Sequence, residues 1–267
     1  DGTLFVTISQ SGETADTLEA LKTAKKINNK IYTLCICNSA ESSITRDSNF
    51  TFLTHAGPEI GVASTKAFTT QLVALALLTC SIGVSKKNIS KQKEKAIVNG
   101  LSQLPGLVNE TLLQEFQIKK LAYRFKNKNS ALFLGRGTMH AIAMEGALKL
   151  KEISYIHAEA YPAGELKHGP IALIDKSMPV IAVAPNDELL GKLKSNLQEV
   201  KSRGSKMIVF EDKDSKVQPM KAMEIISITS NLGRITAPII FTIPLQLLSY
   251  HVALNRGTDV DKPRNLA

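Results

Sequence analysis

The chain of 267 residues is long enough for one large domain or two of ordinary size, and its 43% apolar and 21% charged residues are normal for a soluble globular protein. Much of its net charge of +9 comes from two lysine-rich tracts, 86–95 and 119–128, which we interpret as solvated helix faces. Because no aromatic residues interleave with the basic ones, we predict no nucleic-acid partner.

Cysteine usage and hydropathy favour a reducing, cytoplasmic location. Cys35, Cys37 and Cys80 match neither zinc nor thioredoxin spacing. The most apolar predicted helix, 72–84, has about 13 residues, fewer than the roughly 20 needed to span a bilayer. We therefore predict a protein with no membrane partner.

The first residues have the pattern of an anion-binding turn between a strand and a helix. Residues 4–8 are β-branched or large and apolar, as in a buried parallel strand, and apolar residues recur about every three positions over 14–27. The turn between them supplies a glycine, the positive end of a helix dipole and four polar side chains, those of Ser9, Gln10, Ser11 and Thr14. We predict a phosphate site here. The alternative is an ordinary Ser/Thr cap on a surface helix.

The rest of the first half continues the alternation of strand and helix. We predict strands at 30–37 and 50–54, a polar loop at 55–66 and a long apolar helix that ends near Cys80. Parallel strands end along one edge of a sheet, so the loops around Ser9 and Ser64 should face the same pocket. Residues 85–128 have a helical period and would connect the two halves. We expect a break in them at residues 105–106.

A second series of strands and helices starts at residue 130. It comprises strands at 130–135, 179–184, 206–210 and 223–229, helices at 138–153, 187–203 and 238–255, and a polar tail at 257–267. The order repeats that of the first half, which predicts an internal repeat. We predict an α/β fold of two doubly wound, parallel-sheet, flavodoxin-like subdomains. Their bounds are 1–128, which begins abruptly at a strand as a truncated subdomain would, and 129–267.

The helix at 138–153 has three ionisable residues on one face. Glu145, Lys149 and Glu152 are spaced i, i+4 and i+7, whereas Lys151 points elsewhere. Such a face fits either a catalytic group or a solvent-facing ladder of weak ion pairs, and periodicity alone does not separate the two. The apolar side that would bury the helix consists of Met144, Ala147, Leu148 and Leu150.

A long polar connection at 153–170 follows this helix, with too little apolar content for a core element. Connections of this kind often hold sites. His157 is expected to be structural, as a lone histidine usually is. His168 differs, because Lys167 and a Gly-Pro pair flank it in a sharp, polar turn.

Five segments together resemble one known family. They are SQSGETADT (9–17), EIGVASTKAFTTQ (59–71), EGALKLKE (145–152), AGELKHGP (163–170) and DVDKPRNLA (259–267). In this order, and from end to end of the chain, they resemble the isomerase part of the glutamine:fructose-6-phosphate aminotransferases, or glucosamine-6-phosphate synthases. Any one phosphate-loop segment would be shared with many sugar isomerase (SIS) domains, whereas the five together are specific.

The resemblance implies a role for each matching residue. Glu152 would transfer a proton between C1 and C2 of the sugar with help from Lys149, and His168 would open the sugar ring. The family takes that histidine from the neighbouring subunit, which implies a homodimer. Arg136 and Arg264 are lesser candidates for orienting the sugar or the tail. The sugar phosphate would bind Ser9, Gln10, Ser11 and Thr14, and the sugar hydroxyls would contact Val62, Ala63 and Ser64.

The activity that the resemblance implies is conversion of fructose 6-phosphate and ammonia to glucosamine 6-phosphate, without a metal or organic cofactor. The family also has a glutaminase domain, a Schiff-base lysine directly after the residue that matches Ala267, and a strand and phosphate loop before the residue that matches Asp1. Nothing in this chain corresponds to them, so we expect it to be part of a longer polypeptide. The alternatives are a non-catalytic SIS regulator that binds a phosphosugar and a related sugar-amine phosphate deglycase.

Overall fold

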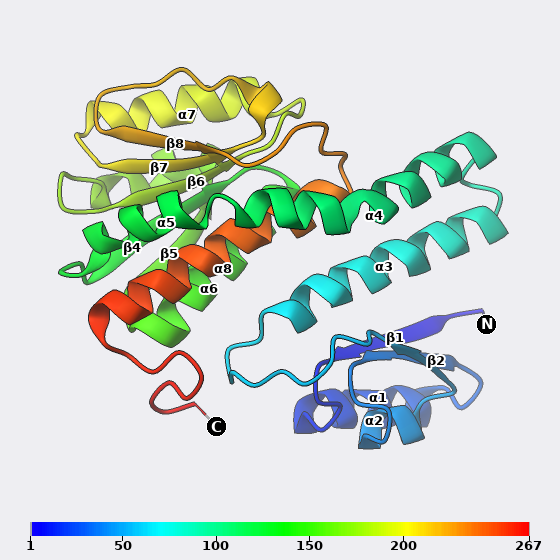
Figure 1. Cartoon of the computed structure of the whole chain (residues 1–267). Helices are drawn as coiled ribbons and strands as arrows, with labels where there is room; N and C mark the ends of the chain where they lie inside the picture. Colours follow the sequence, from blue (N-terminus) through cyan, green and yellow to red (C-terminus); the bar gives the residue numbers. More distant parts are fainter. Residues whose placement is uncertain (1, 267) are drawn as a thin grey trace. The chain divides into compact units, whose positions relative to one another are not determined.

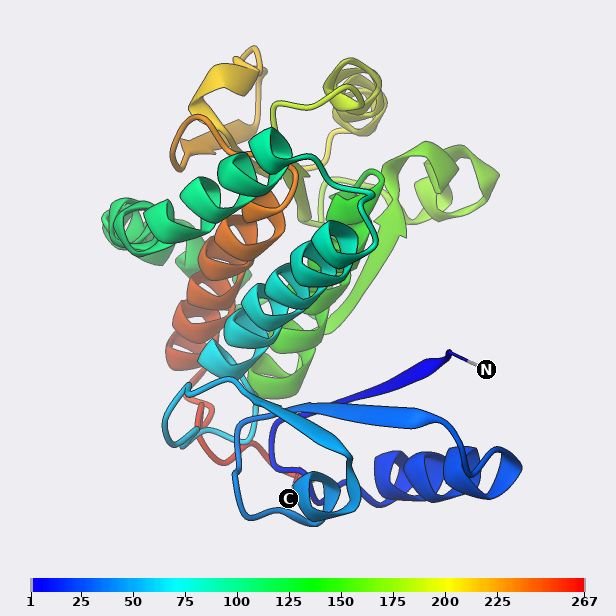
Figure 2. The same ribbon diagram turned by 90° about the vertical axis from the view of Figure 1, so that its right-hand side faces the viewer.

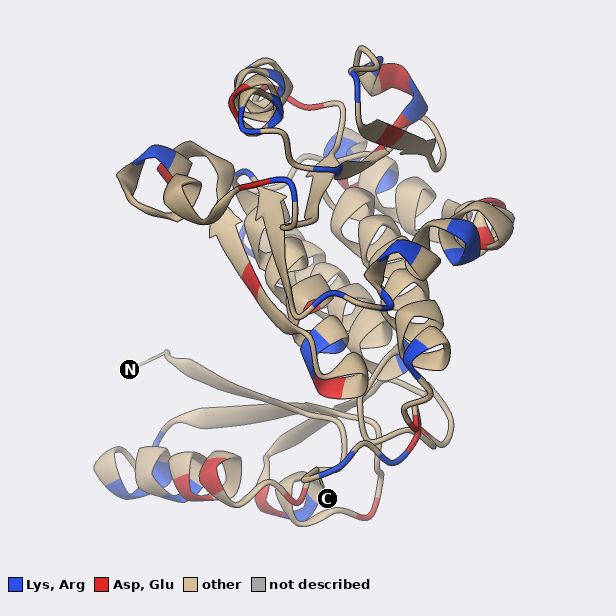
Figure 3. Cartoon of the chain, turned by 90° about the vertical axis from the view of Figure 1, so that its left-hand side faces the viewer, with Lys and Arg blue, Asp and Glu red and all other residues tan. Residues whose placement is uncertain are grey.

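The computed structural model describes residues 2–266, and the chain forms two compact units that divide between Glu94 and Lys95 (Figure 1). Each unit is built on a parallel sheet with helices on its faces, which confirms the predicted fold class. Lysine, arginine and acidic residues lie mainly on helices and loops, whereas the strands are largely free of them (Figure 3). In the second unit the strands at 130–135, 180–184 and 207–211 are almost fully buried. In the first unit only the strand at 32–37 is, whereas the strand at 4–9, predicted to be buried, has Leu4 and Ile8 exposed.

The first unit contains three parallel strands. Its elements are β1 (Leu4–Ser9), α1 (Ala15–Ile27), β2 (Tyr32–Cys37), α2 (Ser43–Asp47), β3 (Phe50–Leu53) and α3 (Lys66–Ser85). The strand order is β1-β2-β3, and Ser9 at the end of β1 lies beside Cys37 at the end of β2. Cys35 and Cys37 pack against α1 and α2, whereas α3 covers the other face (Figure 1). All three cysteines are buried and unpaired.

The second unit contains five parallel strands, and α4 (Lys91–Leu112) leads into it. Its further elements are α5 (Glu115–Ala122), η1 (Tyr123–Phe125), β4 (Ser130–Gly135), α6 (Thr138–Ser154), β5 (His157–Pro162), η2 (Ala163–His168), η3 (Pro170–Leu173), β6 (Val180–Ala184), α7 (Leu190–Ser202), β7 (Met207–Glu211), η4 (Lys213–Ser215), β8 (Met223–Ser227) and α8 (Thr236–Arg256). The strand order β5-β4-β6-β7-β8 is that of flavodoxin-like sheets, and its switch point lies between β4 and β6.

The two faces of this sheet pack against different helices. Val180 and Val209 belong to a buried cluster that also contains Leu193 and Leu197 of α7. On the other face, α6 packs against β4, β5 and α8, and α5 packs against α8 (Figure 1). This arrangement fixes α6 between the sheet and another helix, which limits how much of its polar face can reach solvent.

β5 is a strand where the sequence analysis predicted an irregular connection. Its residues pair with β4 over their whole length, from His157 beside Ser130 to Pro162 beside Gly135. None of the six residues is β-branched, so side-chain propensity gives little indication of a strand. Main-chain pairing with β4, at the edge of the sheet, stabilises the strand although its side chains have low strand propensity. The short helix α2 was also not predicted.

α4 continues through Pro105 and Gly106, so the predicted break at this point was wrong. Both residues are exposed, and the backbone group left without a helical partner can be solvated. The connector packs with the second unit: the Glu110 carboxylate accepts hydrogen bonds from Lys213 and, at 2.7 Å, from the Thr229 hydroxyl.

α3 has 20 residues rather than the 13 predicted, because the polar segment 66–71 joins the helix. By length and composition alone, α3 and α8 could each cross a membrane; 17% and 67% of their most apolar windows are buried. The mostly buried α8 is the core helix of the second unit, and a core helix of a soluble protein meets the same criteria.

Candidate active site

The loop after β1 forms a closed turn that leads into α1. The Ser9 hydroxyl accepts a hydrogen bond from the Gly12 N–H at 2.9 Å, and the Ser11 hydroxyl accepts one from the Glu13 N–H at 3.2 Å. Thr14 is the residue that precedes the first turn of α1. Ser11 and Thr14 are exposed, whereas Ser9 is buried and Gln10 half-buried. The loop thus presents hydroxyls and a helix N-terminus at the carboxyl edge of the sheet, as an anion site requires.

Gly12 sets the shape of this loop. Its φ is +73°, and a Cβ atom at this position would lie 2.0 Å from the Ser42 hydroxyl oxygen. We expect Gly12→Ala to destabilise the first unit by at least about 2 kcal/mol, because it adds a clash to a left-handed backbone. Thermal unfolding measures the loss. Gly106→Ala is the control, since no heavy atom lies within 4 Å of a Cβ there. Equal stability of the two variants would contradict this account of the loop.

The loop after β3 is held by the carboxylate of Glu59, a residue with no predicted role. Glu59 accepts hydrogen bonds from the N–H groups of Thr65 at 3.2 Å and Ala67 at 2.9 Å, at the start of α3. The Glu59 carboxylate also accepts hydrogen bonds from the Thr65 hydroxyl at 3.2 Å and from the Ser64 hydroxyl at 3.4 Å. Glu59 therefore fixes the predicted sugar-contacting segment, in which Val62 is exposed, Ala63 buried and Ser64 half-buried.

Asn38, directly after β2, connects these two loops. Its N–H donates to the Gln10 carbonyl at 3.3 Å. Its side-chain oxygen accepts from the Ala56 N–H at 2.9 Å, and its side-chain nitrogen donates to the Gly57 carbonyl at 2.8 Å. Both predicted substrate-binding loops thus lie at one edge of the sheet and share one asparagine.

In the second unit, α6 presents Glu145, Lys149 and Glu152 on one face, as predicted. The Lys149 ammonium lies 2.6 Å from Glu152 Oε2 and 3.7 Å from Glu145 Oε1. The side chains of Lys149 and Glu145 are only 6% and 9% exposed, so this group is not a solvent-facing ladder. The prediction for the apolar side was partly wrong: Ala147 and Leu150 are buried, whereas Met144 and Leu148 are exposed.

Burial makes Glu145 the most perturbed carboxyl of this group. The pKa of Glu145 is raised to about 7, mainly because desolvation penalises the charged form, while the Lys149 charge opposes the shift. The Lys149 ammonium lies 3.7 Å from Glu145 Oε1 and is closer, at 2.6 Å, to Glu152 Oε2. The closer of the two ion pairs of Lys149 is therefore the one with Glu152.

Glu152 opens onto solvent. Its side chain is 23% exposed and lines a shallow concavity of about 440 Å³, together with Tyr155 from the same helix end and Arg264 and Leu266 from the C-terminal segment. A carboxylate that touches both a buried ammonium and an open concavity can exchange a proton with a bound molecule, while the ammonium stabilises developing negative charge.

The fold does not bring His168 to Glu152 within one chain. Glu152 lies in the last turn of α6, next to the start of β5, whereas His168 ends η2, which follows the end of β5 (Figure 2). β5 has six residues and spans about 17 Å, so the two side chains lie at opposite ends of the sheet. The His168 side chain is 75% exposed, and Glu165 lies 4.0 Å away.

Arg136 and Arg264 contact protein groups. Arg136 Nη1 donates a hydrogen bond to Asn196 Oδ1 at 2.9 Å, and its guanidinium lies against Gly164, where a Cβ would come within 3.1 Å. Arg136 thus packs against η2, the short helix that ends at His168. The Arg264 guanidinium lies over the Tyr155 ring, 4.2 Å from its centroid. Among residues 2–266, no three His, Cys, Asp or Glu side chains form a group that could hold a metal ion.

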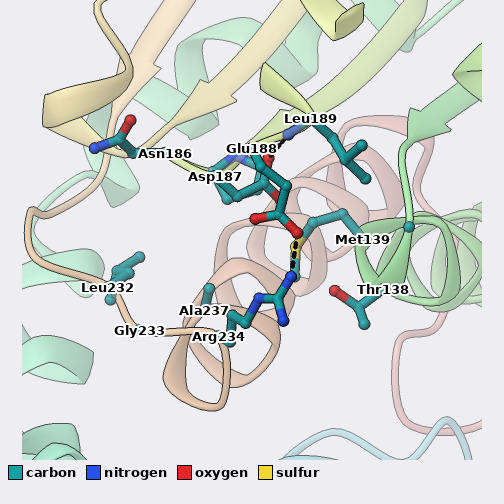
Figure 4. A pocket seen from close by; sticks show the side chains of 12 residues that line it. Thr138, Met139, Asn186, Asp187, Glu188, Leu189, Leu232, Gly233, Arg234 and Ala237 are labelled. Carbon is teal, nitrogen blue, oxygen red and sulfur yellow. Dashed lines mark hydrogen bonds and ion pairs between the residues drawn. The ribbon is translucent and has the colours of Figure 1, made fainter. Parts of the chain in front are cut away.

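A second pocket, of about 330 Å³, lies at the switch point of the five-stranded sheet (Figure 4). Thr138 after β4, Asn186 after β6 and Ala237 of α8 line it. Glu188 and Arg234 form an ion pair within it. None of the residues predicted to act in catalysis lines this pocket. This pocket is therefore separate from the group of ionisable residues on α6.

A family model and the relatives with known names agree on the family to which this chain is similar. The SIS domain model matches residues 1–81 and 124–256. The chain is 57% identical over 264 residues to a glutamine–fructose-6-phosphate aminotransferase (isomerizing) of Pseudomonas aeruginosa and 56% identical over 267 residues to that of Francisella tularensis. These alignments cover 99% and 100% of this chain but only 43% and 44% of the relatives, so the chain spans less than half of their length.

Two solved structures extend this result. The C-terminal domain of glucosamine-fructose-6-phosphate aminotransferase from Francisella tularensis has a TM-score of 0.95 and 54% identity, covering 98% of this chain and 73% of that one. A glucosamine-6-phosphate deaminase from Thermotoga maritima has a TM-score of 0.77 and 25% identity, covering 99% and 74%. The chain therefore belongs to the SIS domain family, and within that family it is similar to the C-terminal domains of glutamine–fructose-6-phosphate aminotransferases.

Proposed function

We propose that this chain is the sugar-isomerising part of a glutamine–fructose-6-phosphate aminotransferase and forms glucosamine 6-phosphate from fructose 6-phosphate and ammonia. The relatives that carry this name match it over 99% of its length. The observation that supports the chemistry most directly is the buried Lys149 ammonium, 2.6 Å from a Glu152 carboxylate that borders an open concavity.

The residue types at the α6 face suit this reaction. Moving a proton between C1 and C2 needs one base that can take it from one carbon and return it to the other, and Glu152 serves as that base. Negative charge develops on the substrate oxygens during the transfer, and Lys149 stabilises it. Glu145 helps to keep the ammonium in place from the opposite side.

The first unit binds the other end of the substrate. Ser9, Gln10, Ser11 and Thr14 hold the phosphate with hydroxyl, amide and helix N-terminal groups, and the segment from Val62 to Ser64 contacts the sugar hydroxyls. Contacts with the phosphate are remote from the reacting carbons, so their binding energy is available for positioning C1 and C2. The fixed loop geometry, with Glu59 and Asn38 as its supports, favours this role.

A second copy of the chain completes the site. His168 opens the sugar ring, because an imidazole can transfer protons to and from the ring oxygen. Its place at the far end of β5 from Glu152 favours delivery of the histidine to the site of a partner, and hence a homodimer. In the longer polypeptide, a glutaminase domain supplies the ammonia, and the enzyme acts in the cytoplasm.

Titration of the isotope-labelled chain with glucose 6-phosphate, followed by NMR, tests the binding part of this proposal. We expect the largest amide shifts at residues 9–14, and we expect Ser11→Ala to weaken binding several-fold, since it removes one hydroxyl contact to a charged group. Ser195→Ala, which removes an exposed hydroxyl on α7, is the control. Shifts centred instead on the pocket of Glu188 and Arg234 would contradict the placement of the phosphate.

A further inference from the structure

Tyr155 has an unusual backbone for a bulky residue. It ends α6 with φ of +61°, in the left-handed region, and its N–H donates to the Lys151 carbonyl at 3.2 Å. This conformation costs free energy for a residue other than glycine, so the surrounding contacts must compensate for it. The ring lies half-buried, three residues after Glu152.

The side chain of Tyr155 makes two contacts with one residue of the C-terminal segment 259–266. Its hydroxyl accepts a hydrogen bond from the Arg264 backbone N–H at 2.8 Å, and its ring lies under the Arg264 guanidinium with 4.2 Å between Cζ and the ring centroid. The second distance is well within the range of a cation–π interaction. The preceding Pro263 is buried, whereas Arg264 and Leu266 are exposed.

These contacts determine one wall of the concavity beside Glu152. The concavity of about 440 Å³ has Glu152 and Tyr155 on one side and Arg264, Asn265 and Leu266 on the other. The segment from 264 to 266 would be free to leave the surface without an attachment to α6. The double contact with Tyr155 provides that attachment three residues from Glu152.

We infer that Tyr155 is a positioning residue that fixes the segment 263–266 against α6 and so keeps the concavity at Glu152 closed on that side. Its strained backbone directs the ring at Arg264, and the hydroxyl and the ring act on the backbone and the side chain of the same residue. The effect of this geometry on turnover rests on the proposed function, whereas the attachment of the segment to Tyr155 is independent of that function.

Hydrogen exchange of the 267-residue chain, measured residue by residue, tests the attachment directly. We expect the Arg264 amide to exchange about 5-fold faster in Tyr155→Phe, which loses only the hydroxyl acceptor, and faster still in Tyr155→Ala, which also loses the ring. Amides of β6 should exchange at the wild-type rate in both. Tyr161→Phe is the matched control, because the Tyr161 hydroxyl donates to Glu159 at 2.6 Å, a contact within β5.

Unchanged exchange at Arg264 in both Tyr155 variants would overturn the inference, as would faster exchange spread equally over β6, which would indicate a general structural role. The kinetic measurement is ammonia-dependent formation of glucosamine 6-phosphate. Tyr155→Ala should lower kcat by about 10-fold with little change in KM for the phosphosugar, because the reacting carbons lose their positioning. If the full-length polypeptide that contains the wild-type chain forms no product, the proposed function fails, while the exchange data still decide the role of Tyr155.

Discussion

Glu152→Gln should lower the rate of glucosamine 6-phosphate formation by about 10²–10⁴-fold. The amide keeps the size of the side chain but cannot accept and return a proton at C1 and C2. Lys149 would keep Glu145 as a counter-ion at 3.7 Å, so the fold should survive the change. Binding of glucose 6-phosphate to residues 9–14 should persist, since those contacts lie on the first unit. The measurement is product formation from fructose 6-phosphate and ammonia, with phosphosugar binding measured in parallel.

Glu159→Gln is the matched control for this variant. Glu159 is a partly exposed carboxylate on β5 that contacts His157 and Tyr161 and takes no part in the Lys149 group. We expect near wild-type rates from it. In a full-length relative with a glutaminase domain, the change that matches Glu152→Gln should leave glutamine hydrolysis intact. Undiminished product formation by Glu152→Gln would refute the assignment of the base, and a loss of phosphosugar binding would indicate damage to the fold instead.

Most of the fold follows from local patterns in the sequence. Strands such as β6 and β7 are short apolar runs between polar turns, and α6 and α7 have a clear helical period, so most strands of both sheets could be predicted. The strand β5, the short helix α2 and the continuation of α4 through Pro105 could not. β5 gains its stability from pairing with β4, a contact between residues more than twenty positions apart, and Pro105 lies on an exposed face of α4 where tertiary context tolerates it.

The sequence predicted which residues share the α6 face, but not which of them are buried. Spacing placed Glu145, Lys149 and Glu152 on one face, and only the packing of α6 between the sheet and α8 explains why two of the three are buried. Glu59 was visible in the sequence as an acidic residue before a helix, a pattern typical of N-terminal capping. Tyr155 had no such pattern, because its partner Arg264 is more than a hundred residues away.

The buried Glu145 makes stability depend on pH in a direction opposite to that of most surface carboxylates. Its pKa is about 7 in the fold against 4.5 for an unperturbed side chain. Between these values the native state holds the proton that the unfolded chain has released, so the free energy of unfolding falls as the pH rises. Below pH 4.5 this loss is absent, and above pH 7 it is complete. Its upper limit is about 3 kcal/mol.

Glu145→Gln should remove this dependence. A neutral amide of nearly the same shape pays no desolvation cost for a charge, while Lys149 keeps its ion pair with Glu152 at 2.6 Å. We expect the variant to match the wild type near pH 5 and to be more stable by about 2 kcal/mol at pH 8. Urea unfolding at intervals from pH 5 to 8 measures the difference. Glu224→Gln, at an exposed carboxylate paired with Arg124, is the control and should leave the slope unchanged.

A persistent fall in stability with pH in Glu145→Gln would show that another group causes it. If the stability of Glu145→Gln no longer falls as the pH rises, then the Glu145 carboxylate is the group that weakens the wild-type fold at neutral pH. A stability cost at a buried ionisable group is typical of functional sites, where pKa values are matched to a task. The same variant should then lower turnover, because Lys149 loses one of its two counter-ions and with it part of the field that keeps its ammonium beside Glu152. Gained stability together with lost turnover is the joint result that this arrangement of charges predicts.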